Sequence, residues 1–259
     1  MILSGKTLVV CGVGGGLGRE VARCALRDGA CVVLGARTRA KLEALAKELD
    51  PTGARVAPVV ADITDAGDCE ALAGTAAERF GSLDALVQVA ALDAVFGGLL
   101  DGDLEDWRRT YETNVIGSMR MIRAAVPHLE RAGGGSVVLI GSQASLLPLV
   151  PQMAYAASKG ALLSAMYHLA KELGPKRIRV NTVVPTWMWG PPVEGYLKAR
   201  AQQQGTTLEA QVRAVTAGMA IPEIPADEDV AEAVVFLASD RARMITGQSL
   251  LVNAGELMR

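Results

Sequence analysis

The 259-residue chain is half hydrophobic and 21% charged, and its formal net charge is −2. These values allow a substantial buried core and argue against a nucleic acid as the main partner. The sequence has no Lys/Arg block typical of a membrane surface, no apolar run long enough to cross a bilayer and no signal-peptide pattern at its start. We therefore expect a cytoplasmic protein.

The cysteines indicate neither a metal site nor a disulfide framework. There are four of them, Cys11, Cys24, Cys31 and Cys69, without CxxC spacing, and only two histidines accompany them. Metal ligands usually occur in closer clusters of these residue types. The sequence thus predicts reduced, buried thiols and no bound metal.

Short apolar runs rich in β-branched residues alternate with longer helical patterns. The expected strands are residues 7–11, 31–35, 56–60, 85–89, 136–140, 179–184 and 249–252. The expected helices are residues 16–27, 39–49, 66–80, 104–129, 155–173 and 227–238. Strands that are apolar throughout and alternate with helices predict an α/β fold, a doubly wound, Rossmann-like parallel sheet of about seven strands with helices on both faces. No linker interrupts the pattern, so we expect one domain over residues 1–259.

One segment departs from the alternation. Residues 186–226 lie between the last two expected strands, are rich in proline and contain two helical stretches, residues 194–204 and 208–217. A connection this long is usually functional in a compact domain. We predict that it forms a lid over a substrate.

A glycine-rich turn follows the first strand and opens the first helix. Within this turn, the residues expected to contact a ligand are Gly12, Gly15, Gly16, Leu17 and Gly18. Glycines allow the backbone to approach a diphosphate that rests on a helix N-terminus. No Gly-Lys-Ser/Thr follows, which disfavours a P-loop nucleotide triphosphatase. The alternative interpretation is a plain glycine-rich turn.

The end of the second strand bears on which dinucleotide binds. An acid at this place would bind the adenosine ribose and repel a 2′-phosphate. The sequence has no acid there and has Arg37 and Arg39 instead. Guanidinium groups suit a phosphate, so NADP(H) is preferred over NAD(H). Alternatively, both arginines are solvated residues at the start of a helix.

Tyr155 and Lys159 lie four residues apart and hence on one face of a helix. An ammonium group beside a phenol stabilises the phenolate, which predicts that Lys159 lowers the pKa of Tyr155. Such a tyrosine can exchange a proton with an alcohol or an alkoxide. Ser142, just after a strand, is placed to hydrogen-bond the same substrate oxygen. Taken singly, each residue is also typical of a helix surface or a turn.

In their order and spacing these motifs resemble the short-chain dehydrogenase/reductase family over essentially the whole chain. The matching positions are Gly12, Gly16, Gly18, Asp62, Asn114, Ser142, Tyr155 and Lys159. The resemblance implies that Tyr155 is the acid/base, that Lys159 also holds the nicotinamide ribose and that Asn114 orders a relay water. It also implies that Asp62 contacts the adenine amino group.

The resemblance extends to further contacts and to assembly. It implies cofactor contacts at Ile63, Ala90, Ala91, Pro185 and Met188. It also implies a homodimer or homotetramer. The Tyr–Lys interval resembles the dehydrogenase/reductase branch rather than the enoyl reductases, in which the interval is longer.

Four places depart from the family pattern. Cys11 replaces a threonine whose hydroxyl pins the turn after the fourth strand, and residues 88–91 of that turn are themselves altered. A thiol is a poorer hydrogen-bond partner, which puts the support of this turn in question. Gly190 lacks the threonine side chain that contacts the carboxamide, and residues 253–255 differ from the common Asp-Gly-Gly.

Apolar residues near the expected nicotinamide site indicate the substrate. They are Trp187, Met188, Trp189, Tyr196 and the run at residues 146–150. Such a pocket suits a hydrophobic ketone or secondary alcohol, although the same residues could form a lid core or a subunit interface. We thus expect an NAD(P)(H)-dependent oxidoreductase. A 3-oxoacyl-thioester reductase is an alternative, and an impaired dinucleotide-binding sensor or scaffold is an alternative of another class.

Overall fold

The computed structural model describes residues 1–148 and 150–258, which build one parallel sheet with the strand order β3-β2-β1-β4-β5-β6-β7. The strands are β1 Thr7–Cys11, β2 Cys31–Ala36, β3 Val56–Val60, β4 Ala85–Gln88, β5 Gly135–Ile140, β6 Ile178–Pro185 and β7 Ser249–Val252. The order reverses between β1 and β4, as in a doubly wound sheet. The predicted Rossmann-like fold is confirmed.

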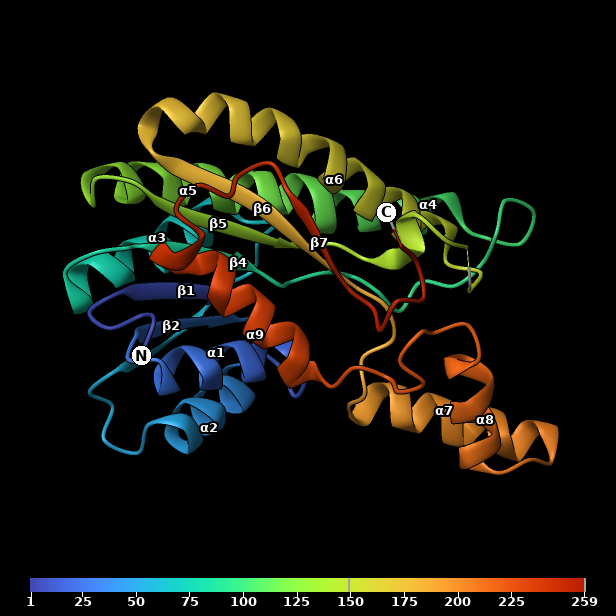
Figure 1. The fold of residues 1–259 in the computed structure, drawn as a ribbon. Helices are drawn as coiled ribbons and strands as arrows, with labels where there is room; N and C mark the ends of the chain where they lie inside the picture. The colour runs from blue at the N-terminus through green and yellow to red at the C-terminus, as the bar shows by residue number, and fades with distance from the viewer. Residues whose placement is uncertain (149, 259) are drawn as a thin grey trace.

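Helices cover both faces of this sheet (Figure 1). One face carries α1 Leu17–Arg27, α2 Arg39–Leu49 and α9 Asp227–Ala238, and the other carries α3 Ala66–Phe80, α4 Leu104–Tyr111, α5 Ser118–Arg131 and α6 Met153–Leu173. None of the helices in the described residues is long and apolar enough to cross a membrane.

The strands are apolar throughout because each supplies both faces. Leu8 and Val10 of β1 belong to the core beneath α1 and α9, whereas Val9 and Cys11 belong to the core beneath α3 and α5. Successive side chains of a strand point to opposite faces, so burial on both sides requires an unbroken apolar run.

The helix expected over residues 104–129 is interrupted. A π-helical turn, Glu112–Gly117, separates α4 from α5. Periodicity cannot reveal the wider turn, because the chain remains helical through it and the apolar pattern shifts by one residue only. Gly117 packs against Ile63 here, and an added Cβ at Gly117 would lie 2.8 Å from the Ile63 side chain. The interruption lies at Asn114.

Smaller differences occur at element ends. Strand β4 ends at Gln88 rather than residue 89, because the amides of Val89 and Ala90 both turn toward the carbonyl of Cys11. Helix α6 begins at Met153, before Tyr155. Helix ends commonly vary by one or two residues.

The segment predicted as a lid forms two helices, α7 Pro191–Gln204 and α8 Leu208–Thr216. They pack on each other and project from the sheet beyond the end of β6 (Figure 1). The two ends of the segment are joined, since the Trp189 amide donates to the Pro225 carbonyl at 2.7 Å in a parallel bridge between Trp189 and Ala226. The chain therefore enters α7 and leaves α8 through two neighbouring, hydrogen-bonded segments.

Candidate active site

Two adjoining cavities lie at the carboxyl ends of the strands. The larger, about 870 Å³, is lined by the glycine-rich turn, the end of β2 and residues that follow β3 and β4. The smaller, about 440 Å³, lies beneath the first turns of α7. Tyr155 and Asp93 line both. Crevices at this edge of an open parallel sheet are the usual ligand sites of such folds.

The glycine-rich turn is shaped for a large group in the first cavity. Gly12 has a φ of +102°, and an added Cβ would lie 2.2 Å from the Ala90 nitrogen, so only glycine fits there. An added Cβ at Gly14 or Gly15 meets nothing within 4 Å. The turn thus packs tightly on the sheet and stays open toward the cavity, as a backbone cradle for a diphosphate requires.

The altered turn after β4 is supported in spite of Cys11. The amides of Val89 and Ala90 each donate to the Cys11 carbonyl at 2.8 Å, and the Gln88 side-chain amide donates to the Ala90 carbonyl at 3.4 Å. The Cys11 thiol is buried, and burial raises its pKa. Hydrogen bonds to backbone carbonyls therefore hold this turn without a contribution from a hydroxyl at residue 11.

Polar and basic side chains gather where the larger cavity meets the end of β2. Arg37, Thr38 and Lys41 line it, whereas Arg39 does not line it and pairs with Glu43 at 3.4 Å. Of the two arginines considered from the sequence, the structure thus brings Arg37 to the cavity and leaves Arg39 outside.

Asp62 and Ile63 form the neighbouring wall. Asp62 accepts hydrogen bonds from the Thr64 amide at 2.9 Å and the Thr64 hydroxyl at 2.8 Å. Burial works to raise the pKa of Asp62, but these hydrogen bonds and the charge of Arg37 outweigh it, and the pKa is lowered. Asp62 is therefore an ionised acceptor at this wall.

Lys159 and Tyr155 lie side by side on α6, and the ammonium group is held by a backbone carbonyl. Lys159 is 3% exposed, and its Nζ donates to the Ile140 carbonyl at 2.7 Å. The Nζ lies 5.6 Å from the centre of the Tyr155 ring. Burial lowers the pKa of Lys159 to about 8, with the charge of Asp93 acting against it.

The pKa of Tyr155 differs from the sequence-based expectation. Burial raises it to about 12, a hydrogen bond with Ser142 acts to lower it, and Asp93 raises it further. The prediction that Lys159 lowers the pKa of Tyr155 is therefore wrong for this structure. Desolvation of the phenol dominates, and the Lys159 ammonium group donates to the Ile140 carbonyl. Tyr155 holds its proton at neutral pH.

Asn114 is fully buried and fixes the chain beside the site. Its Oδ1 accepts from the Leu92 amide at 2.6 Å, and its Nδ2 donates to the Leu92 carbonyl at 3.1 Å and to the Ser158 hydroxyl at 2.9 Å. Neither Asn114 nor Pro185 lines either cavity. Asn114 thus connects the segment that carries Asp93 to α6.

The smaller cavity has an aromatic wall. Trp187 and Tyr196 face each other with ring centres 5.8 Å apart, and Met188 and Val150 extend the apolar surface. Trp189 and residues 146–148 of the expected apolar run do not line it, and Leu149 lies outside the described residues. The structure therefore brings part of the predicted substrate wall together.

Comparison with known proteins agrees with this geometry. A family model described as enoyl-(acyl carrier protein) reductase matches residues 12–256. Dehydrogenase/reductase SDR family member 4 of Mus musculus is 34% identical over 253 residues, covering 98% of this chain and 88% of the relative. The chain belongs to the short-chain dehydrogenase/reductase family. The predicted nicotinamide-dependent oxidoreductase is thereby confirmed.

Other relatives in the family have different substrates in their names. L-rhamnose 1-dehydrogenase (NAD(P)(+)) of Azotobacter vinelandii is 35% identical over 261 residues, 98% of each chain. 2-(S)-hydroxypropyl-CoM dehydrogenase 3 of Xanthobacter autotrophicus is 33% identical, covering 98% of this chain and 97% of the relative. A short-chain type dehydrogenase/reductase from Mycobacterium ulcerans superposes with a TM-score of 0.90 at 30% identity, over 99% of this chain and 91% of that chain.

The structure adds residues that sequence reasoning missed in this dehydrogenase/reductase. Asp227, at the start of α9, lines the larger cavity, and Gln143 lines the smaller one. Gln143 donates to Glu256 at 2.7 Å and accepts from Asn253 at 2.6 Å, which connects the cavity to the segment after β7. No local pattern indicates these residues, because their neighbours in space are distant in sequence.

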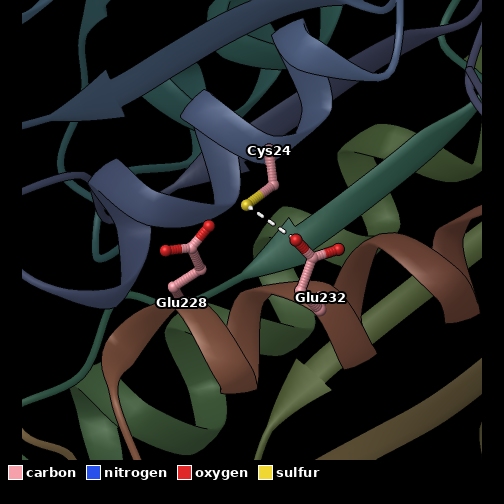
Figure 2. A group of neighbouring side chains, drawn as sticks. All are labelled: Cys24, Glu228 and Glu232. Atoms are coloured by element: carbon pink, nitrogen blue, oxygen red, sulfur yellow. Dashed lines mark hydrogen bonds between the residues drawn. The ribbon is translucent and has the colours of Figure 1, made fainter.

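A cluster of possible metal ligands lies outside both cavities, between α1 and α9. It consists of Cys24, Glu228 and Glu232 (Figure 2). Arg23 pairs with Glu228 at 2.6 Å, and Arg27 pairs with Glu232 at 2.5 Å. Burial raises the pKa of the Cys24 thiol to about 11, so the thiol is protonated. Both carboxylates are thus paired with arginines of α1, and these ion pairs connect α1 with α9.

Proposed function

We propose that this protein is an NADP(H)-preferring dehydrogenase/reductase that interconverts a hydrophobic ketone and its secondary alcohol, with Tyr155 as the acid/base. The observation that carries the proposal is the position of Tyr155 in the wall shared by two cavities, one shaped for a dinucleotide and one for a small apolar molecule. A group between the two ligands can exchange a proton with the oxygen whose carbon gains or loses a hydride.

A nicotinamide dinucleotide supplies or accepts the hydride when it is bound. In the reducing direction Tyr155 gives its proton to the carbonyl oxygen as that oxygen gains negative charge. The raised pKa of about 12 keeps this proton in place at neutral pH until the alkoxide develops. The Ser142 hydroxyl, which lines the smaller cavity with Tyr155, donates to the same oxygen. The Lys159 ammonium group, 5.6 Å from the centre of the Tyr155 ring, stabilises the phenolate that the proton transfer leaves.

The first cavity fits the dinucleotide along its length. We assign the diphosphate to the turn at residues 12–18, the adenine to Asp62 and Ile63, and the nicotinamide half to the wall formed by residues 90–91, Lys159 and Met188. Arg37, Thr38 and Lys41 at the adenosine end favour a 2′-phosphate, which supports NADP(H) over NAD(H).

This preference is testable with an Arg37→Asp variant. A carboxylate at the 2′-phosphate should weaken NADPH binding by about 10- to 100-fold and leave NADH binding within about twofold. Arg39→Asp is the matched control, because Arg39 does not line the cavity. Dissociation constants from fluorescence titration give the NADPH/NADH ratio. An unchanged ratio in Arg37→Asp removes Arg37 from cofactor selection.

The second cavity favours an uncharged substrate. Among the described residues its lining contains the acid Asp93 and no lysine, arginine or histidine. An anionic group would meet the carboxylate without a compensating cation. A 3-oxoacyl thioester therefore fits only with its anionic carrier outside this cavity. The Tyr–Lys interval supports the dehydrogenase/reductase branch over enoyl reduction.

Further parts of the proposal concern the surroundings of the site. Residues 186–226 act as a substrate lid, supported by the position of α7 over the smaller cavity and by the joined base at Trp189 and Ala226. The protein assembles as a homodimer or homotetramer in the cytoplasm. The formed turn at residues 88–91 favours an enzyme over an impaired sensor, because the cofactor wall is supported there.

A Tyr155→Phe variant tests the function. Loss of the phenol hydroxyl should lower kcat/KM for ketone reduction by at least about 100-fold, in the range of general acid catalysis, with NADPH affinity retained. Tyr167→Phe is the matched control, since Tyr167 lies on the same helix and is 53% exposed. We would measure kcat/KM of the unaltered protein and of both variants with neutral, cationic and anionic ketones. Equal turnover by Tyr155→Phe and the unaltered protein would rule out Tyr155 as the acid/base.

A further inference from the structure

Asp227 is a half-buried acid that faces the cofactor cavity. Its Oδ2 lies 3.4 Å from the position that a Cβ of Gly16 would occupy, and 2.6 Å from that of a Cβ of Gly190. The carboxyl group therefore lies between the glycine-rich turn and Gly190, the residue that precedes α7. A carboxylate is unexpected at this place, because it would repel the diphosphate of a dinucleotide bound on the glycine-rich turn.

Asp227 lies in the first turn of α9, where the helix dipole favours a carboxylate, but it does not cap the helix. Asp229, rather than Asp227, caps the helix, because its Oδ2 accepts from the Ala226 amide at 2.8 Å. No hydrogen bond or ion pair of Asp227 occurs among the described residues. A partly buried carboxylate without a partner is costly, so a functional reason is expected.

The charges around Asp227 do not compensate it. Glu20 of α1, whose charge acts on Asp227, pairs with Arg19 at 3.0 Å and with Arg23 at 2.6 Å. Arg23 also pairs with Glu228 at 2.6 Å. Both arginines are thus engaged away from Asp227, while burial and the charge of Glu20 raise its pKa.

We propose that the Asp227 carboxylate opposes the diphosphate of the bound dinucleotide, weakens its binding and speeds its release. The inference rests on the proposed assignment of the diphosphate to residues 12–18. Backbone amides of the turn and the N-terminus of α1 attract the diphosphate, and Asp227 offsets part of this attraction from the facing wall. The affinity is thereby set below the highest value that the turn could give, which favours exchange of the spent cofactor.

The location also connects the effect to the predicted lid. Asp227 follows Ala226, which is bridged to Trp189, and its carboxyl group contacts the space beside Gly190. The same residue therefore lies both at the cofactor cavity and at the base of the segment that carries α7 and α8.

The test is calorimetric titration of NAD⁺ and ADP-ribose into the unaltered protein, Asp227→Asn and Glu228→Gln at pH 8. Asp227→Asn should tighten the binding of both ligands by about tenfold or more, because removing one of two like unit charges a few ångströms apart at a half-buried site changes an affinity by at least about this factor. Stopped-flow dissociation should slow by a similar factor. Glu228→Gln removes the same charge from the next residue, whose carboxylate faces Arg23, and should leave both affinities unchanged.

The outcomes separate the alternatives. Tighter binding of NAD⁺ without tighter binding of ADP-ribose places the contact at the nicotinamide and overturns the diphosphate inference. Unchanged or weaker binding of both ligands to Asp227→Asn, in a variant with the thermal midpoint of the unaltered protein, also overturns it. If the unaltered protein binds neither of these ligands nor NADP⁺, the proposed function fails instead.

Discussion

At the scale of single residues, the burial of Lys159 carries a cost in stability. The side chain is 3% exposed, and burial lowers its pKa to about 8. The ordinary lysine value is about 10.4, so the unfolded chain holds this proton to higher pH than the folded protein. Between these two values the unfolded state binds more protons, and stability therefore rises with pH.

This sign gives a prediction for Lys159→Met. The free energy of unfolding of the unaltered protein, relative to the variant, should rise by about 2–3 kcal/mol between pH 7 and pH 10. Urea unfolding at the two pH values gives the difference. The matched control is Lys171→Met, because Lys171 is exposed on the same helix. A relative stability that stays constant or falls over this range contradicts a depressed pKa at Lys159.

Sequence reasoning was strong on the identity of the site residues and weak on their electrostatics. Tyr155, Lys159, Ser142 and the glycines were expected from the order of the motifs, and the structure gathers them at one edge of the sheet. The raised pKa of Tyr155 was not expected, because desolvation depends on what covers the group in three dimensions. The assignment of catalytic roles to these residues stays a prediction.

At the scale of elements, the junction between the glycine-rich turn and β4 is the tightest part of the site. An added Cβ at Gly12 would lie 2.2 Å from the Ala90 nitrogen, at a φ of +102°. Both the clash and the backbone conformation oppose any side chain there, and together they should cost about 3 kcal/mol or more.

Gly12→Ala should therefore lower the free energy of unfolding by about this amount and weaken NADP⁺ binding by more than about tenfold. Chemical denaturation and calorimetric titration measure the two effects. Gly14→Ala is the matched control for folding, since its Cβ meets nothing within 4 Å. Equal stability of the two variants is incompatible with the packing of the turn on Ala90.

The helices and strands themselves were largely predictable. The bounds of α2, α3, α9, β1, β3 and β7 agree with the expected residues, because apolar periodicity and turn residues mark them locally. The π-helical turn at Glu112–Gly117 was missed. It depends on the tertiary contacts of Asn114 with Leu92 and Ser158, which no window of sequence contains.

At the scale of the whole molecule, the larger cavity joins parts of the chain that are far apart in sequence, from Gly12 to Asp227. A ligand that binds there stabilises the folded state as a whole. At a free concentration of 100 times its dissociation constant, the stabilisation is about 2.7 kcal/mol, which corresponds to roughly 5–10 °C for a chain of this size.

NADP⁺ should therefore raise the thermal midpoint by roughly this amount, and NAD⁺ at the same concentration should raise it less. Differential scanning fluorimetry measures both shifts. The Arg37→Asp variant should abolish the difference between the two ligands while keeping the NAD⁺ shift. A larger shift with NAD⁺ than with NADP⁺ in the unaltered protein contradicts the proposed cofactor preference.

The sequence by itself determined the doubly wound fold, the family and the residues that the motifs place at the carboxyl edge of the sheet. It could do so because apolar periodicity, glycine turns and the Tyr155–Lys159 interval are local patterns. The tertiary structure alone decided that Asp93 joins two cavities, that Lys159 donates to Ile140 and that Asp227 faces the glycine-rich turn. These features depend on burial and on contacts between distant segments, which arise only when the chain has folded.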